Sequence, residues 1–277
     1  MATLDVRIRL LTDDLGNKGT IGNFSILMEA ALKEGADYLF FADQDDVWQA
    51  NKLTIMLTAM QEMERQAADK PLLVHCDLEV VDEVLQSIAP SFTKFSRLSP
   101  TRANLGMLLC QNQVTGCASL INRNLLELAC PVPHEVLMHD WWLALLAAAS
   151  GKIGFVPLPL VRYRQHGRNV LGAVSFGKRL WQLLSSSSQW KRHIAVIKGG
   201  ILQSSLLAER LNERNMTLPQ GALEQINTYA HILDVKPIHR AATLSRYGIG
   251  KSLPRTGLIY SLFLALIRIR HERKCRG

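Results

Sequence analysis

The stretch YLFFADQDD, residues 38–46, joins an uninterrupted apolar run to three carboxylates in four positions. A short apolar run without polar alternation predicts a strand buried on both faces. Gly35 precedes it and predicts the end of a helix over residues 24–34, because glycine readily adopts the left-handed conformation that follows a helix. The sequence therefore predicts a helix, a buried strand and then an acidic turn.

The neighbouring segments continue this alternation. Residues 6–12 favour a β-type run, residues 51–67 are helical in pattern, and residues 72–76 form a second apolar run that ends in Asp77. Strand, helix and strand at this spacing predict an α/β fold with a mostly parallel sheet covered by helices. Ligands bind beyond the carboxyl ends of such strands. The acidic turn and Asp77 are both expected at that edge.

The pattern then divides the chain into two regions. We expect an irregular stretch at residues 86–112, strands at 113–122 and 153–161, and helices at 124–129 and 139–150. Beyond about residue 175 the pattern is helical and basic, without further strands. We therefore predict an α/β domain over residues 1–174 and a helical appendage over residues 175–277.

Charge is distributed unevenly along the 277 residues. Residues 1–161 carry 12 Lys and Arg against 19 Asp and Glu, whereas residues 162–277 carry 20 against 5. The basic part suits an anionic partner, such as a phosphorylated substrate or an anionic membrane surface, unless it is simply a solvated surface. No nucleic-acid-binding motif is present, so we expect no nucleic acid.

One apolar segment lies within this basic part, at residues 258–267. It is much shorter than the roughly 20 residues of a transmembrane helix. Arg255, Arg268, Arg270, Arg273 and Lys274 flank it. Two arrangements remain open: the segment lies on an anionic membrane surface, or it docks onto the protein and completes its core.

The cysteines and the N-terminus favour a cytoplasmic protein. The five cysteines are scattered and form no CxxC pair, which favours reduced, mostly buried thiols. They are Cys76, Cys110, Cys117, Cys130 and Cys275. The first residues do not resemble a secretory signal peptide. A cytoplasmic protein that contacts the inner face of the membrane peripherally would fit both observations.

Asp43, Asp45 and Asp46 crowd like charges at the end of a buried strand. Such crowding is costly unless a cation lies among the carboxylates. A few carboxylates completed by phosphate oxygens are typical of Mg²⁺ or Mn²⁺ sites in nucleotide chemistry. A solvated acidic turn that favours the start of the following helix is the equally weighted alternative.

Asp140 opens the expected helix at residues 139–150 and is followed by Trp141 and Trp142. It would serve as a helix cap or as a general base. Two adjacent tryptophans are not expected to enter one core together, so we expect one ring to be exposed for stacking on a sugar.

A basic segment, RYRQHGRN, follows the last expected strand at residues 162–169. Its arginines, Arg164 among them, suit phosphate oxygens, and His166 suits a manganese ion. A solvated basic loop is the alternative.

Taken together, these segments resemble the family 2 glycosyltransferases, most closely the bacterial rhamnosyltransferase-like members. The likeness covers roughly residues 6–175. It rests on FADQDDVWQANKL (41–53), VHCDLEVVDE (74–83), NQVTGCASLINR (112–123), MHDWWLAL (138–145) and YRQHGRNVLGA (163–173).

The resemblance implies a GT-A fold and inverting transfer of a sugar, such as rhamnose, from a UDP- or dTDP-sugar to a glycan or lipid-linked acceptor. Asp43 and Asp45 match the family's DxD motif, in which the first faces the donor and the second binds the metal. Asp140 matches the catalytic base. Arg164 and His166 are expected at the diphosphate and metal. The remaining substrate contacts are expected at Trp48, Trp141, Trp142 and Asn169.

The chain departs from the family pattern at its start. Nothing matches the first strand with its ATYNG-like loop or the second strand with its DDGS-like turn, which hold the nucleotide base and ribose. We expect a sheet that lacks these N-terminal strands. A truncated, inactive remnant that binds sugar or a partner is therefore the alternative function. A metal-dependent nucleotidyl- or phosphotransferase is a third, but it gives no reason for the HDWW and YRQHG segments.

Overall fold

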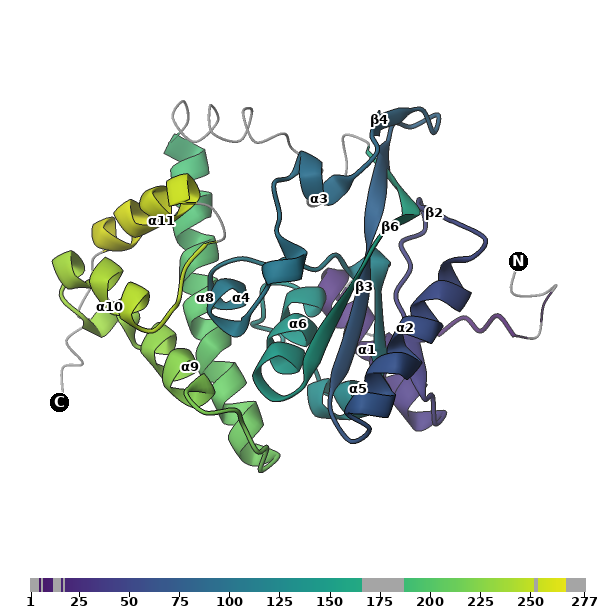
Figure 1. The fold of residues 1–277 in the computed structure, drawn as a ribbon, viewed down its shortest axis with the longest axis horizontal. Helices are drawn as coiled ribbons and strands as arrows, with labels where there is room; N and C mark the ends of the chain where they lie inside the picture. The colour runs from purple at the N-terminus through teal and green to yellow at the C-terminus, as the bar shows by residue number, and fades with distance from the viewer. Residues whose placement is uncertain are drawn as a thin grey trace.

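The computed structural model describes residues 5, 7–11, 16, 18–165, 187–251 and 254–267, except for the side chains of residues 187–189, 254–256 and 258. The chain forms an α/β half and a helical half. In Figure 1 the sheet and its covering helices lie on the right, and the C-terminal helices lie on the left.

The α/β half is built on a mixed sheet, not on the mostly parallel sheet that the sequence predicts. The strand order is β1 (Tyr38–Phe40), β5 (Ser119–Asn122), β3 (Leu72–Val81), β6 (Lys152–Arg164) and β2 (Val47–Trp48), and β4 (Ser87–Ala89) pairs with β3. Only β3 and β6 pair in parallel, and every other described pair is antiparallel. The described part is thus α/β, with a more mixed sheet than expected.

The expected ligand edge nevertheless forms. Strand β5 is antiparallel to both β1 and β3, so β1, β3 and β6 all run in the same direction. Their carboxyl ends share one edge of the sheet. The same edge receives the segment that enters β5, because β5 runs the other way. The acidic turn after β1 and the residues before β5 therefore meet.

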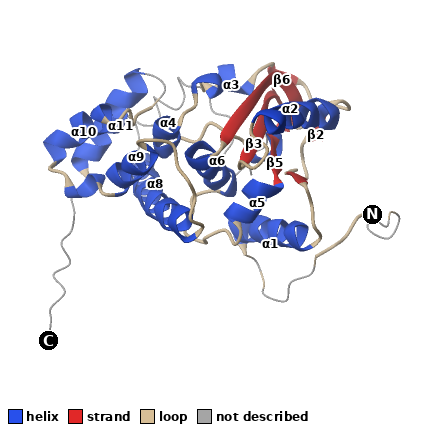
Figure 2. Ribbon diagram, turned by 60° about the horizontal axis from the view of Figure 1, so that its bottom comes forward, coloured by secondary structure: helices blue, strands red, loops and turns tan. Residues whose placement is uncertain are grey.

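Helices cover both faces of the sheet (Figure 2). On one face, Met56 and Met60 of α2 (Lys52–Gln66) pack with Leu72 and Val74. On the other, Leu73 packs in a cluster that includes residues of α1 (Gly19–Lys33), α5 (Arg123–Ala129) and α6 (His139–Ser150). Neighbouring residues of β3 thus enter opposite cores, as the strand period of two requires. The expected helices at residues 51–67, 124–129 and 139–150 are confirmed to within a residue or two.

Two local expectations are wrong. Residues 8–11 form no strand. Asp77 lies inside β3, because β3 continues to Val81, and the pairing register with β6 shifts beside it. The Asp77 carboxylate accepts hydrogen bonds from the Thr93 backbone N–H and from the hydroxyls of Ser91 and Thr93, so its role is structural.

The stretch at residues 86–112 is also more regular than expected. Besides β4, it contains α3 (Phe92–Phe95), the 3-10 helix η1 (Pro100–Arg102) and α4 (Leu105–Cys110). Another 3-10 turn, η2 (Gly116–Ala118), leads into β5.

The C-terminal part is helical where it is described, as predicted. It comprises α8 (Ser187–Glu213), α9 (Ala222–Ala230), η3 (Ile232–Asp234), η4 (Pro237–His239), α10 (Arg240–Arg246) and α11 (Pro254–Leu266). The predicted boundary near residue 174 lies outside the described residues.

The two halves share one hydrophobic core. Leu207, Leu211 and Ile226 of the helical half are fully buried in the cluster that also contains α5 and α6. Arg210 of α8 donates hydrogen bonds to the carbonyls of Leu128 and Ala129 at the end of α5. The helices are therefore an integral part of the packing and not a loosely attached appendage.

A close backbone contact offers a test of this shared core. A Cβ at Gly106 in α4 would lie 2.2 Å from the Gly248 carbonyl oxygen, whereas one at Gly200 in α8 would meet nothing closer than 3.4 Å. We predict that Gly106→Ala lowers the free energy of unfolding by about 1–3 kcal/mol, since overpacking forces the backbones apart. Gly200→Ala should be neutral or slightly stabilising. The unfolding free energies of both variants are measured by urea denaturation, monitored by circular dichroism and tryptophan fluorescence. Two separate unfolding transitions in the wild-type protein would contradict a shared core.

Candidate active site at the sheet edge

The acidic turn lies between β1 and β2 and is held by the end of β6. The Arg164 backbone N–H donates to Asp46 Oδ1 over 3.0 Å. The Arg164 guanidinium donates through Nε to the Asp45 carbonyl, at 2.8 Å, and through Nη1 to the Glu83 carbonyl. Arg164 thus lies at the acidic turn, where these donors brace the backbone of the turn.

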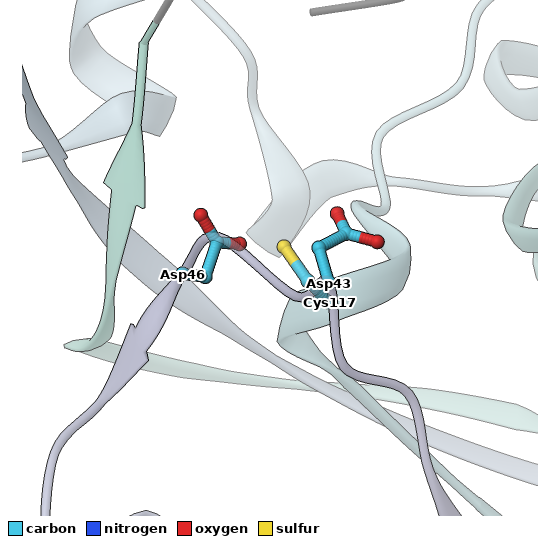
Figure 3. A group of neighbouring side chains, drawn as sticks. All are labelled: Asp43, Asp46 and Cys117. Atoms are coloured by element: carbon cyan, nitrogen blue, oxygen red, sulfur yellow. The ribbon is translucent and has the colours of Figure 1, made fainter. Parts of the chain in front are cut away.

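Asp43, Asp46 and Cys117 converge at the edge. One side-chain ligand atom from each lies within 4.8 Å of the others. Figure 3 shows the Cys117 sulfur between the two carboxyl groups in this view, with the Asp46 carboxyl directed toward it. Burial raises the pKa of both carboxyls, and the charge of Asp45 raises them further. The turn therefore concentrates negative charge in a partly desolvated place.

Lys52 supplies the nearest buried positive charge. It is fully buried, its Nζ donates to the Cys117 carbonyl over 2.7 Å, and it lies 3.4 Å from the centre of the Trp48 ring. Burial lowers the Lys52 pKa to about 8, while Asp46 and Asp43 oppose that shift. Trp48, expected at the substrate, therefore has a protein cation against its ring and packs against Phe40.

A divalent cation fits the two carboxyl groups. Asp46 Oδ2 is buried, and no described donor meets it with hydrogen-bond geometry. The Cys117 thiol interacts with the Asp46 carboxyl and lowers its pKa, but a thiol is a weak donor, so a buried carboxylate oxygen beside it remains costly unless a cation or another ligand satisfies it. Burial raises the pKa of the Cys117 thiol well above its usual value, so the sulfur is a neutral, weak donor beside the site. Oxygen ligands alone suit Mg²⁺ or Mn²⁺.

The residues in this group differ partly from those expected. Asp43 belongs to it, but its carboxylate neighbour is Asp46 rather than Asp45, the predicted metal ligand. Asp45 is partly exposed in the same turn. His166 and Asn169, the other expected ligand and substrate residues, lie outside the described residues.

Asp140 lies in the first turn of α6 and faces the segment that enters β5. Its Oδ1 accepts from Asn112 Nδ2 and its Oδ2 from the Gly116 backbone N–H, both over 3.0 Å. Only 7% of the residue is exposed. Burial raises the Asp140 pKa to about 6 despite these hydrogen bonds, and the charge of Asp43 contributes to the rise. Asp140 therefore interacts electrostatically with the acidic turn.

The expectation that one of the two tryptophans is exposed is wrong. Trp141 and Trp142 are both buried, and their indole N–H groups donate to the carbonyls of Leu108 and Ala129. Helix α6 packs against α4, α5, α8 and the sheet, so adjacent residues of it point into different parts of one core. Neither ring offers a face for stacking on a sugar in this structure.

His139 precedes the candidate base and is buried, and neither of its ring nitrogens has a hydrogen-bond partner within the described part of the chain. Its ring stacks on Phe24 of α1, with centroids 3.9 Å apart. Burial lowers the His139 pKa to about 4, so the ring is neutral near pH 7. A Cβ at Gly116 would lie 2.8 Å from His139 Nε2. Glycine is therefore required where the backbone N–H reaches Asp140.

Sequence reasoning missed several residues of this site. Asn112, Gly116 and Cys117 all belong to the segment NQVTGC, which carries part of the family resemblance but no acidic or basic side chain. Lys52 was missed because a lysine at the start of a helix is usually solvated.

Comparison with known proteins adds no assignment. No family model matches the chain, and no curated protein matches it. None of the described helices combines the length and the apolar character needed to cross a bilayer. The interpretation of the site therefore rests on its geometry and on the sequence resemblance.

The buried carboxyl of Asp140 predicts a pH dependence of stability. Its pKa rises from the usual 3.8 to about 6 on folding, so the folded state binds a proton more tightly than the unfolded chain. This contribution is fully present below about pH 4 and is lost as the pH rises through about 6. We expect the unfolding free energy of the wild type, relative to Asp140→Asn, to fall by about 2–3 kcal/mol between pH 4 and 7.

Urea titrations at several pH values, with chelator present, measure this difference. Burial lowers the pKa values of His75 and His139 to about 4. Their contribution to the unfolding free energy therefore has the opposite pH dependence and is lost as the pH falls. They affect both proteins equally and cancel in the comparison. A difference that stays constant with pH would show that Asp140 titrates normally.

The geometry of the acidic turn predicts which groups bind a metal. We expect Asp46→Asn to weaken Mn²⁺ binding at least about tenfold, because it replaces a carboxylate ligand. Cys117→Ser should change it by no more than about twofold, because a protonated thiol contributes little to a hard cation. Calorimetric titration of Mn²⁺, with and without UDP, measures both. Equal losses in the two variants would instead indicate a thiolate ligand.

Proposed function

We propose that the chain is a metal-dependent, inverting glycosyltransferase that acts on a nucleotide-diphosphate sugar. The observation that carries this proposal is the position of two consecutive residues: the Gly116 backbone N–H donates to Asp140, and Cys117 lies in one group with Asp43 and Asp46. A candidate base and a candidate diphosphate site thus lie within reach of one substrate. The proposal is also supported by the sequence segments quoted above, which resemble those of rhamnosyltransferase-like enzymes and follow the same order along the chain.

Asp140 would accept the proton of the acceptor hydroxyl as its oxygen attacks the anomeric carbon. A carboxyl with a pKa of about 6 is mostly ionised at neutral pH and is a stronger base than a solvated carboxylate. Asn112 and the Gly116 N–H each bind one of its oxygens and hold the group in one orientation. The Trp141 backbone N–H also hydrogen-bonds to the carboxylate, which leaves one of its roughly four lone-pair positions for the hydroxyl.

Asp43 and Asp46 would hold Mg²⁺ or Mn²⁺ at the diphosphate of the donor. When bound, the metal offsets the negative charge that develops on the leaving diphosphate. Arg164 would act indirectly, because its backbone N–H and guanidinium fix Asp46 and the Asp45 carbonyl. Lys52 would stabilise the carboxylates when the metal is absent.

The donor and acceptor are proposed by class only. A UDP- or dTDP-sugar, with rhamnose as one candidate, fits the resemblance, and the acceptor would be a polysaccharide precursor or a lipid-linked glycan. A cytoplasmic location is part of the same proposal.

A sugar- or partner-binding protein without transferase activity is the second candidate. The observation that favours it is the burial of Asp140, which leaves 7% of the residue exposed and gives both oxygens a protein hydrogen-bond donor. A carboxylate in that position also serves to hold the segment before β5 in place. The two candidates differ in whether Asp140 is needed for turnover or only for folding.

We predict that Asp140→Asn lowers turnover at least about a hundredfold, since it removes the proton acceptor. It should leave the affinity for Mn²⁺ with UDP within about twofold. Turnover is followed as UDP or dTDP release from UDP-glucose and dTDP-rhamnose with a panel of sugar and lipid-phosphate acceptors. Asp234→Asn, which changes an exposed aspartate on η3, is the matched control and should behave as the wild type. Wild-type binding without turnover on any acceptor would favour the second candidate.

A further inference from the structure

Helix α11 has one face that docks onto the protein. Phe263, Leu264 and Ile267 are buried in the shared core, and Trp190 and His193 of α8 contact the Phe263 ring. Arg240 of α10 donates to the carbonyls of Leu264 and Ile267 at the end of the helix. Of the two arrangements that the sequence left open, docking therefore describes this face.

The opposite face of α11 stays exposed and apolar. Leu262 and Leu266 are 54% and 50% exposed, and Ala265 between them is also exposed. Spacings of three and four residues place these side chains on one side of a helix. We call them the outer stripe. A docked helix normally places polar residues on its solvent side, so the outer stripe is an unpartnered apolar face.

The segment that carries the outer stripe is basic. Residues 235–267 contain five Lys and Arg and no Asp or Glu. Lys236 and Arg246 of this segment are exposed. The turn η4, which packs against α11, presents Ile238 with 81% of its surface exposed. The nearest acidic residue before this segment is Asp234, whose Oδ2 lies 3.3 Å from His231 Nδ1.

We propose that the outer stripe and its basic surroundings form a docking surface for an anionic lipid bilayer. The apolar side chains would enter the boundary between headgroups and acyl chains, and Lys236 and Arg246 would approach the lipid phosphates. Each basic residue near an anionic surface adds to the attraction. The inner face of α11 remains docked, so the helix lies on the membrane as part of the folded protein.

A second copy of the chain is a weaker occupant. The outer stripe has three small or medium-sized apolar side chains, whereas a standard protein interface buries about 800 Å² on each partner. The net positive charge around the stripe would also repel an identical surface. An anionic bilayer satisfies the apolar and the basic part together. This inference needs no sugar donor, so it stands apart from the transferase proposal.

Vesicle co-sedimentation of the full chain at low salt tests the proposal. We expect partitioning into phosphatidylcholine vesicles that contain phosphatidylglycerol to exceed that into pure phosphatidylcholine by at least about tenfold. The double variant Leu262→Gln, Leu266→Gln should reduce binding to the anionic vesicles by about tenfold. The double variant Lys236→Gln, Arg246→Gln should reduce it similarly and weaken its dependence on salt.

A matched control separates the outer stripe from general hydrophobicity. Leu27 of α1 is 48% exposed and belongs to the other half of the molecule, and Leu27→Gln should bind vesicles as the wild type does. Thermal unfolding of each variant shows whether it is folded. Equal recovery in the supernatant with neutral and anionic vesicles would overturn the proposal. The proposal would also be overturned if the wild-type protein dimerised and did not bind vesicles, and if the Leu262→Gln, Leu266→Gln variant lost that dimerisation. A second copy of the chain would then be the occupant.

Discussion

The antiparallel direction of β5 is the constraint on which the candidate site depends. Because β5 lies reversed between β1 and β3, the chain enters it at the edge where β1, β3 and β6 end. That entry places Cys117 beside the acidic turn and the Gly116 N–H beside Asp140. A parallel β5 would begin at the opposite edge of the sheet. Neither the carboxylate pair nor the candidate base would then have its present neighbours.

Buried charge sets the energetic character of this edge. Desolvation is the largest cause of the raised pKa of Asp43, Asp46 and Asp140, and also of the lowered pKa of Lys52. Attraction between Lys52 and the two carboxylates opposes these shifts without removing them. Such an arrangement stabilises the fold less than an apolar replacement would. We therefore propose that its value is functional: a partly desolvated acidic cluster would be ready for a cation or a hydroxyl proton.

Local sequence patterns predict helix α6 and the acidic turn. The direction of β5 and the burial of the two tryptophans depend instead on contacts between distant segments. Helix α6 is predicted to the residue, because the polar residues His139 and Asp140 open its apolar run and Gly151 follows it. The acidic turn was placed correctly at the end of β1. The direction of β5 is not predictable from the sequence, because all four of its residues are buried and a strand buried on both faces shows no alternation in either direction. The burial of Trp141 and Trp142 was missed for a related reason, since it depends on α4, α5 and α8 enclosing α6 from several sides.

The burial that makes α6 a core helix also determines how Asp140 would act. Trp141 and Trp142 anchor the helix through hydrogen bonds to Leu108 and Ala129, and His139 stacks on Phe24. The carboxylate therefore stands on a helix whose first turn is fixed on several sides. A base held in this way loses little orientational freedom when it meets a hydroxyl. Because Asp140 is held in place, the acceptor hydroxyl would have to approach a fixed carboxylate. The segment around Asn112 and Gly116 shields that carboxylate and would therefore select which hydroxyl reaches it.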